Sequence, residues 1–128
     1  MIRIVRLGSP RGRGEGLRIG AARRPPRGVK KKDYARLDYY DAWLPELAPS
    51  QKMVSWAQSR PFTDKRWAKF ERGYRRETAR PEAARLLELL ARLSHQADFS
   101  LGCYCEDERR CHRSILRQLL AERGARIS

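Results

Sequence analysis

The chain has no apolar run long enough to cross a membrane. A membrane span needs roughly 18 consecutive apolar residues, and the longest apolar stretch, Leu86–Leu93, is interrupted by Glu88 and Arg92. The N-terminal segment MIRIVRLGSPRG is too short in its apolar part, and too rich in arginine, for a secretory signal. We therefore expect no membrane association and a cytoplasmic location, where thiols stay reduced.

Cysteine and histidine are scarce, with three cysteines and two histidines in 128 residues. An odd number of cysteines would leave one thiol over in a disulfide framework. All three cysteines and one histidine nevertheless lie in one short segment, CYCEDERRCHRS, at Cys103–Ser114. This crowding makes the segment the first candidate for a functional site.

Acidic residues are also few, and the charge is uneven. The chain has 29 Lys or Arg and 15 Asp or Glu, a net charge of +14. Residues 1–36 contain 12 basic and two acidic residues (+10), whereas residues 37–128 contain 17 and 13 (+4). Such a positive field attracts the phosphates of nucleic acids, nucleotides or small metabolites. An arginine-rich composition alone identifies no specific partner.

The pattern of apolar residues predicts an α/β protein. Strands are expected at MIRIVRLG, LRIGA and ADFSLGCYC, where apolar residues alternate, and YYDAWLPELAPS has strand-like aromatic content. Helical spacing predicts helices at SQKMVSWAQS, TDKRWAKFERGYRRET and RPEAARLLELLARLSHQ, and from Cys111 to Arg123. The aromatic stripe of the second helix is typical of a core. The Pro- and Gly-rich RRPPRGVKKK must be a loop.

These elements indicate one domain over residues 1–128, with a basic N-terminal segment at residues 1–36. Strands separated by helices favour a small, mostly parallel sheet flanked by helices in a Rossmann-like layering. Ligands of such sheets bind beyond the carboxyl ends of the strands. We expect the cysteine segment to lie at such an end, with Cys105 closing a strand.

A zinc site is the first interpretation of this segment. Three sulfurs and one nitrogen are a permissible tetrahedral set, from Cys103, Cys105, Cys111 and His112. The spacing argues against it, because structural zinc sites favour C-x2-C pairs. Neighbouring residues on a helix also point about 100° apart, so Cys111 and His112 should diverge. We therefore expect no metal.

Three other interpretations concern the thiols. A phosphatase-like loop is excluded, because the acidic residues at 106–108 would raise a thiol pKa and repel phosphate. A redox pair of Cys105 and Cys111 stays open, since a strand end and a helix start could come within disulfide reach. The cysteines could also be small buried apolar residues, with His112 as a capping residue.

The remaining interpretation is a strand, an acidic turn and a helix that together line a polar pocket. His112 and Arg113 would then lie in the first turn of the helix, where free amides attract anions. The candidate catalytic residues are Cys105 as nucleophile and His112 as acid or base.

The basic loop is the expected opposite wall of that pocket. The predicted anion-binding residues are Arg27, Lys30, Lys31 and Arg113. No cofactor is expected. Two function classes stay open: an enzyme acting on a phosphorylated or nucleotide-like small molecule, and a non-catalytic nucleic-acid-binding module that uses the basic loop.

Four stretches carry a resemblance to a known family: RRPPRGVKK, LPELAPS, WAKFERGYRRE and CYCEDERRCHRSIL. In this order, from about Arg18 to Glu122, they resemble the YeaO-like family of uncharacterised bacterial proteins, a domain of unknown function. The resemblance implies no established activity. It singles out the basic loop, Glu77 and the residues Cys105, Cys111, His112 and Arg113.

Two departures from the family pattern bear on function. One branch of the YeaO-like family has Asn-His in place of Cys111-His112 and lacks the first cysteine. That branch argues against a shared zinc site and leaves the histidine as the common element. This chain also has Pro25 where the family usually has tryptophan, which removes an aromatic platform for base stacking from the loop.

Overall fold

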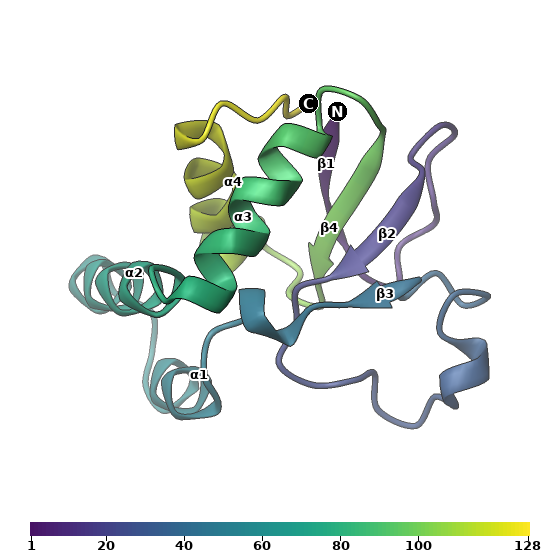
Figure 1. Cartoon of the computed structure of the whole chain (residues 1–128). Coiled ribbons are helices and arrows are strands. Elements are labelled where there is room, and N and C mark those ends of the chain that lie inside the picture. The colour runs from purple at the N-terminus through teal and green to yellow at the C-terminus, as the bar shows by residue number, and fades with distance from the viewer.

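The computed structural model describes all residues from 1 to 128 and contains a four-stranded, fully parallel sheet (Figure 1). Its strands are β1 (Ile2–Arg6), β2 (Leu17–Gly20), β3 (Ala42–Trp43) and β4 (Phe99–Cys103), in the order β1-β4-β2-β3. The helices are α1 (Gln51–Gln58), α2 (Asp64–Thr78), α3 (Pro81–Leu93) and α4 (His112–Glu122). The predicted single α/β domain with a parallel sheet is confirmed. None of these helices meets the length and apolarity that a bilayer crossing requires.

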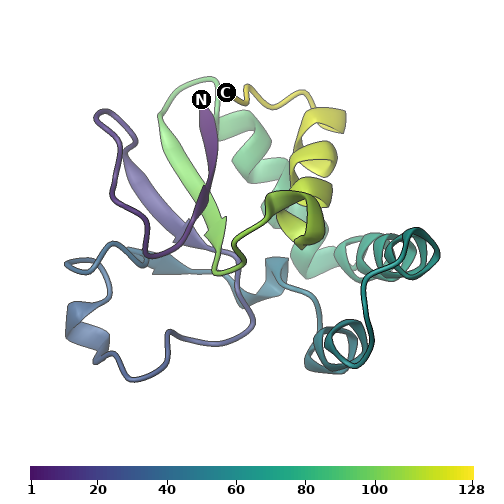
Figure 2. The ribbon, with the colours of Figure 1, turned by 180° about the vertical axis from the view of Figure 1, so that it is seen from behind.

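The core lies between one face of the sheet and the helices. All five residues of β4 are buried, because this strand lies between β1 and β2. Leu101 of β4 pairs with Ile4 on one side and Ile19 on the other, so that these apolar side chains share a face. The helices gather on one side of the sheet in both views (Figures 1 and 2).

Three of the predicted helix starts are confirmed, and two of these helices have a side-chain cap. The Ser50 side chain accepts the Met53 N–H, and the Thr63 side chain accepts the Arg66 N–H. Pro81 is the first residue of α3, where its missing N–H costs nothing. The aromatic stripe of α2 packs into the core as expected, with Tyr74 fully buried.

Loops cover the opposite face, and buried charges hold them there. Arg18 alternates with Ile19 and so points away from the helices. Its guanidinium is fully buried and makes a bidentate pair with Glu15, at 2.9 and 3.0 Å. The backbone N–H of Arg18 donates to Asp41 at 2.8 Å, and Asp41 in turn accepts Arg11 at 2.7 Å. These arginines join the loops around residues 7–16 and 38–41 to the sheet.

Some element boundaries differ from the sequence expectation. The strand β4 ends at Cys103, so the expectation that Cys105 closes it is wrong by two residues. A short 3-10 turn follows at Glu108–Arg110, and α4 starts only at His112. The YYDAWLPELAPS segment forms only the two-residue β3 and a 3-10 turn at Pro45–Leu47.

Candidate functional site

The cysteine corner, defined as Cys103, Cys105, Cys111 and His112, lies between the end of β4 and the start of α4. Cys111 precedes the helix in extended conformation, with φ −126° and ψ 148°. Its Sγ therefore turns toward His112 and lies 3.7 Å from Nδ1. One ligand atom each from Cys103, Cys111 and His112 fall within 4.8 Å of one another. One of the two reasons for expecting no zinc, the divergence of Cys111 and His112, is therefore wrong, because the two side chains converge.

The three thiols interact with one another. Hydrogen bonding to Cys103 and then Cys105 lowers the pKa of Cys111 far below its ordinary value. Hydrogen bonding to Cys105 and Cys111, together with burial, raises the pKa of Cys103. Cys103 and Cys111 are buried, whereas the predicted nucleophile Cys105 is the exposed one. All three cysteines are free, and the redox pair of Cys105 and Cys111 stays a prediction.

His112 is held from both sides of its ring. Its Nε2 lies 2.6 Å from the carbonyl oxygen of Ala21, and its Nδ1 faces Cys111. The ring also packs edge-on against Tyr74, with centroids 5.4 Å apart. Only 6% of the residue is exposed. Both ring nitrogens are therefore engaged within the protein, and the predicted acid or base role stays a prediction.

Arg113 points into the protein instead of toward a ligand at the surface. The residue is 3% exposed, and its guanidinium donates to the carbonyl oxygen of Cys105. Its Nε has no hydrogen-bond partner. No carboxylate forms an ion pair with it. Arg113 is thus a buried cation without a counter-ion from any acidic side chain.

The basic loop flanks the cysteine corner without sharing contacts with Arg113. Its predicted anion-binding residues are exposed: Arg27, Lys30 and Lys31. The start of the loop is fixed to the corner, because the Tyr104 hydroxyl donates to the Arg24 carbonyl at 2.9 Å. No hydrogen bond or ion pair connects the three exposed residues to His112 or Arg113. The single anion pocket stays a prediction.

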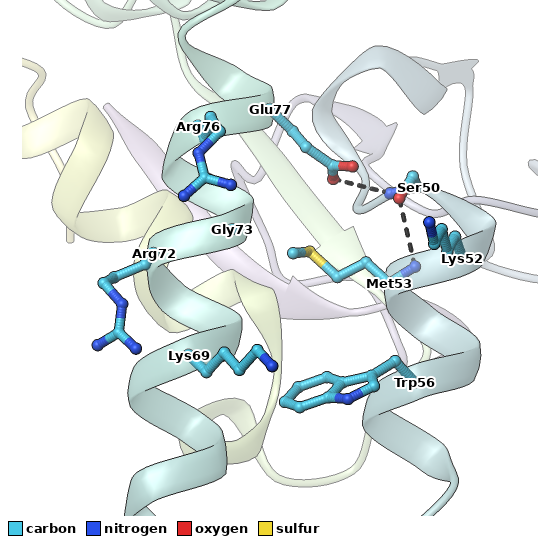
Figure 3. A pocket seen from close by; sticks show the side chains of 9 residues that line it. All are labelled: Ser50, Lys52, Met53, Trp56, Lys69, Arg72, Gly73, Arg76 and Glu77. Atoms are coloured by element: carbon cyan, nitrogen blue, oxygen red, sulfur yellow. Dashed lines mark hydrogen bonds between the residues drawn. The ribbon is translucent and has the colours of Figure 1, made fainter.

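A second candidate site, which we call the α1–α2 groove, lies between α1 and α2 (Figure 3). It consists of two hollows of about 480 and 390 Å³ that share Trp56, Lys69 and Arg72. Seven basic residues line it: Lys52, Arg60, Lys65, Arg66, Lys69, Arg72 and Arg76. The only acidic residue is Glu77. None of the residues predicted from the sequence as catalytic or anion-binding lines it.

The groove exists because α1 and α2 approach closely at one point. A Cβ atom on Gly73 would lie 2.0 Å from Cε of Met53, so only glycine fits there without displacing Met53. Glu77 of α2 accepts the backbone N–H of Ser50 at 2.9 Å, at the start of α1 (Figure 3). Glu77, which the family resemblance singled out, therefore anchors one helix to the other.

Trp56 lies in both hollows and is surrounded by positive charge. The guanidinium carbon of Arg66 is 4.2 Å from the centroid of the indole, and the Lys69 ammonium is 5.3 Å from it. Figure 3 shows the Lys69 side chain reaching from α2 toward the Trp56 ring. These are cation–π contacts, which hold a positive charge over an aromatic face.

The basic residues of the groove are not neutralised. None of the seven forms an ion pair. The neighbouring Arg75 differs, because it pairs with Glu71 at 3.2 Å and with Glu122 at 3.0 Å on the other side of α2. The groove therefore concentrates uncompensated positive charge on one surface.

The sequence contains a signal for this surface that our prediction did not use. Four basic residues of α2 recur at spacings of four, three and four: Lys65, Lys69, Arg72 and Arg76. This spacing aligns them on one face of a helix. The partner face on α1 depends on tertiary contacts that the sequence does not display.

A comparison with protein-family models matches residues 2–124 to DUF488-N3a, described as the active DUF488-N3 subclade. The chain belongs to this family. DUF488-N3a is a domain of unknown function, so the resemblance found from the motifs is confirmed at the level of an uncharacterised family. The matched residues include both the cysteine corner and the α1–α2 groove. No curated protein and no solved structure matches the chain.

Proposed function

We propose that this DUF488-N3a protein binds the phosphate backbone of a nucleic acid in the α1–α2 groove. One observation supports this: seven basic side chains without ion pairs surround a groove that contains a single carboxylate. That carboxylate, Glu77, is already engaged by the Ser50 N–H. Clustered, unpaired cations attract phosphates, and phosphate contacts supply most of the affinity of nucleic-acid binding.

The shape of the groove favours a polyanion over a small phosphorylated molecule. The two hollows adjoin each other and the basic residues are spread along both, whereas one phosphate contacts only two or three side chains. Trp56 lies at the junction. A base stacked on an aromatic ring contributes about 1–3 kcal/mol, so Trp56 is the candidate platform in place of the family tryptophan that Pro25 replaces.

The alternative predicted from the sequence, an enzyme acting on a phosphorylated small molecule, has weaker support. It requires His112 and Arg113 to face a ligand, and both residues are buried. The nucleic-acid-binding alternative was expected to use the basic loop. We assign the binding to the α1–α2 groove because its cations surround a hollow, whereas Arg27, Lys30 and Lys31 are exposed loop residues.

The test compares two variants that remove the same amount of charge. The groove variant is Lys69→Gln with Arg72→Gln, and the control is Arg27→Gln with Lys31→Gln. Binding to a fluorescent single-stranded oligonucleotide is measured by anisotropy over a range of salt concentrations. The groove variant should bind about tenfold more weakly or worse. Its salt slope should fall by about 1.4, because each of the two cations that neutralises a phosphate of a single strand adds roughly 0.7 to the slope.

The control variant should bind less than about threefold more weakly, because its cations are absent from the groove. Equal effects in both variants would contradict the proposal and indicate a diffuse basic surface. ATP as competitor distinguishes the ligands: displacement of the oligonucleotide by equimolar ATP would favour a nucleotide site and contradict nucleic-acid binding.

A further inference from the structure

A second site is independent of the α1–α2 groove. We propose that the cysteine corner binds one zinc ion through the thiolates of Cys103, Cys105 and Cys111 and through Nδ1 of His112. The distances lie close to those of such a centre. Zinc–ligand bonds of about 2.0–2.3 Å in a tetrahedron place the ligand atoms roughly 3.3–3.8 Å apart. Cys111 Sγ and His112 Nδ1 are 3.7 Å apart, and Cys103 joins them within 4.8 Å.

The fourth ligand is Cys105. Cys105 lies two residues after Cys103, beside the group of Cys103, Cys111 and His112 whose ligand atoms lie within 4.8 Å of one another, and a rotation of its side chain completes the set. Cys105 is the only exposed member, and it lies on the turn after β4, where the backbone has no sheet partners. It therefore closes the site from the solvent side, while Cys103 and Cys111 pack inside in an apolar cluster with Leu7, Ala22 and Tyr40.

His112 is already oriented as a metal ligand. A carbonyl oxygen only accepts hydrogen bonds, so the 2.6 Å contact with Ala21 assigns the proton to Nε2. The lone pair then lies on Nδ1, the atom that faces Cys111. Metal-binding histidines nearly always donate their other ring N–H to a carbonyl or carboxylate, which fixes the ring in this way.

Arg113 provides the second, independent observation. A buried cation needs an anion nearby, yet Arg113 pairs with no carboxylate and its Nε lacks a partner. Its guanidinium donates to the carbonyl oxygen of Cys105, which places the charge beside the cysteine corner. A zinc ion with three thiolates and a neutral imidazole carries one net negative charge, and each thiol that is still protonated releases its proton when it binds. That complex supplies the anion that the fold omits beside Arg113.

A soft set of three sulfurs and one nitrogen in tetrahedral arrangement selects zinc over magnesium or calcium. A disulfide between Cys105 and Cys111 is the competing fate of the same atoms. It would leave Cys103 and the Nδ1 lone pair of His112 without a role, and Arg113 without an anion. We do not extend the zinc site to the whole YeaO-like family, because one branch of that family lacks the first cysteine.

The test uses the full chain, reduced and stripped of metal by a chelator. Zn²⁺ should bind at one equivalent by elemental analysis, with a dissociation constant below about 100 nM. Co²⁺ should give tetrahedral absorption bands and a thiolate charge-transfer band. Cys111→Ser should abolish both. Cys105→Ser should keep one equivalent with at least tenfold weaker binding and a weaker charge-transfer band, because one thiolate is missing. The control His95→Gln, at the other histidine, should bind as the wild type does.

Two results would overturn the proposal. One is a reduced wild-type protein that binds no Zn²⁺ or Co²⁺ below about 10 µM, because structural sites bind far more tightly. The other is full metal binding by Cys111→Ser. The first result needs only the wild-type chain. The proposal can therefore be contradicted even if a variant fails to fold.

Discussion

Two basic regions of this chain look alike in composition and behave differently in the structure. Residues 1–36 carry a net charge of +10, and residues 51–80 carry nine basic and three acidic residues, or +6. In the first region several arginines serve the fold. Arg18 is buried against Glu15, Arg11 pairs with Asp41, and Arg23 donates to three backbone carbonyls. In the second region the basic residues of the α1–α2 groove have no ion pairs.

A count of charges therefore does not locate an anion site. An arginine with a carboxylate or several carbonyls has its hydrogen bonds satisfied within the protein and contributes to stability. An exposed, unpaired cation contributes little to stability and stays available to a ligand. Residues 51–80 therefore offer the better anion-binding surface, although their net charge is smaller than that of residues 1–36.

The largest expected effect comes from removing an acidic residue that pairs with a buried arginine of residues 1–36. Glu15→Ala leaves the fully buried guanidinium of Arg18 without its counter-ion, and the free energy of unfolding should fall by about 3–5 kcal/mol. Urea unfolding followed by circular dichroism measures the change. Glu46→Ala, at an exposed residue without an ion pair, is the control and should change stability by less than about 0.5 kcal/mol. A decrease below about 1 kcal/mol in Glu15→Ala would show that the pair does not hold the loops.

A smaller effect is expected on the pH dependence of stability, through Asp41. The hydrogen bond from Arg11 lowers the pKa of Asp41 below its ordinary value of 3.8. Because the folded pKa is the lower one, Asp41 stabilises the fold above pH 3.8, and this contribution is lost as the pH falls through the folded pKa. Asp41→Asn should reduce stability at pH 7 by about 1–3 kcal/mol. Its unfolding free energy should also vary less with pH below 4 than that of the wild type. If the unfolding free energy of Asp41→Asn varied with pH below 4 as that of the wild type does, the pairing of Asp41 with Arg11 would not stabilise the fold.

The smallest expected effect is that of removing basic residues of the α1–α2 groove on the free energy of unfolding. Lys69→Gln with Arg72→Gln should leave the unfolding free energy within about 0.5 kcal/mol of the wild type, because neither side chain has an ion pair to lose. The same urea titration measures it. A destabilisation above about 1.5 kcal/mol would mean that these residues serve the fold, as Arg18 does.

The sequence predicted the elements better than it predicted the site. Periodicity identified all four helices and the central strand, because it depends only on residues near one another along the chain. Ser50, Thr63 and Pro81 fix three of the helix starts through equally local contacts. The convergence of Cys111 and His112 was missed, because it depends on the extended backbone of Cys111 and on the 3-10 turn before it.

The α1–α2 groove shows a different limit of sequence inference. The basic stripe of α2 was visible in the sequence. Its position opposite Trp56 depends on contacts between residues far apart along the chain, including Gly73 against Met53. Such contacts are set by the packing of the whole domain and leave no local pattern.

The most direct measurement follows two tryptophan indoles by NMR during titration with a single-stranded oligonucleotide. Trp56 lies in the α1–α2 groove, whereas the indole of Trp43 donates to the Ala22 carbonyl, next to the basic loop. If the groove binds the phosphate backbone, the Trp56 indole signal and the backbone amides of residues 69–76 should shift with increasing ligand. The Trp43 signal and the amides of residues 27–32 should then stay in place. Shifts at Trp43 and residues 27–32 with an unchanged Trp56 would contradict the groove and place binding on the basic loop.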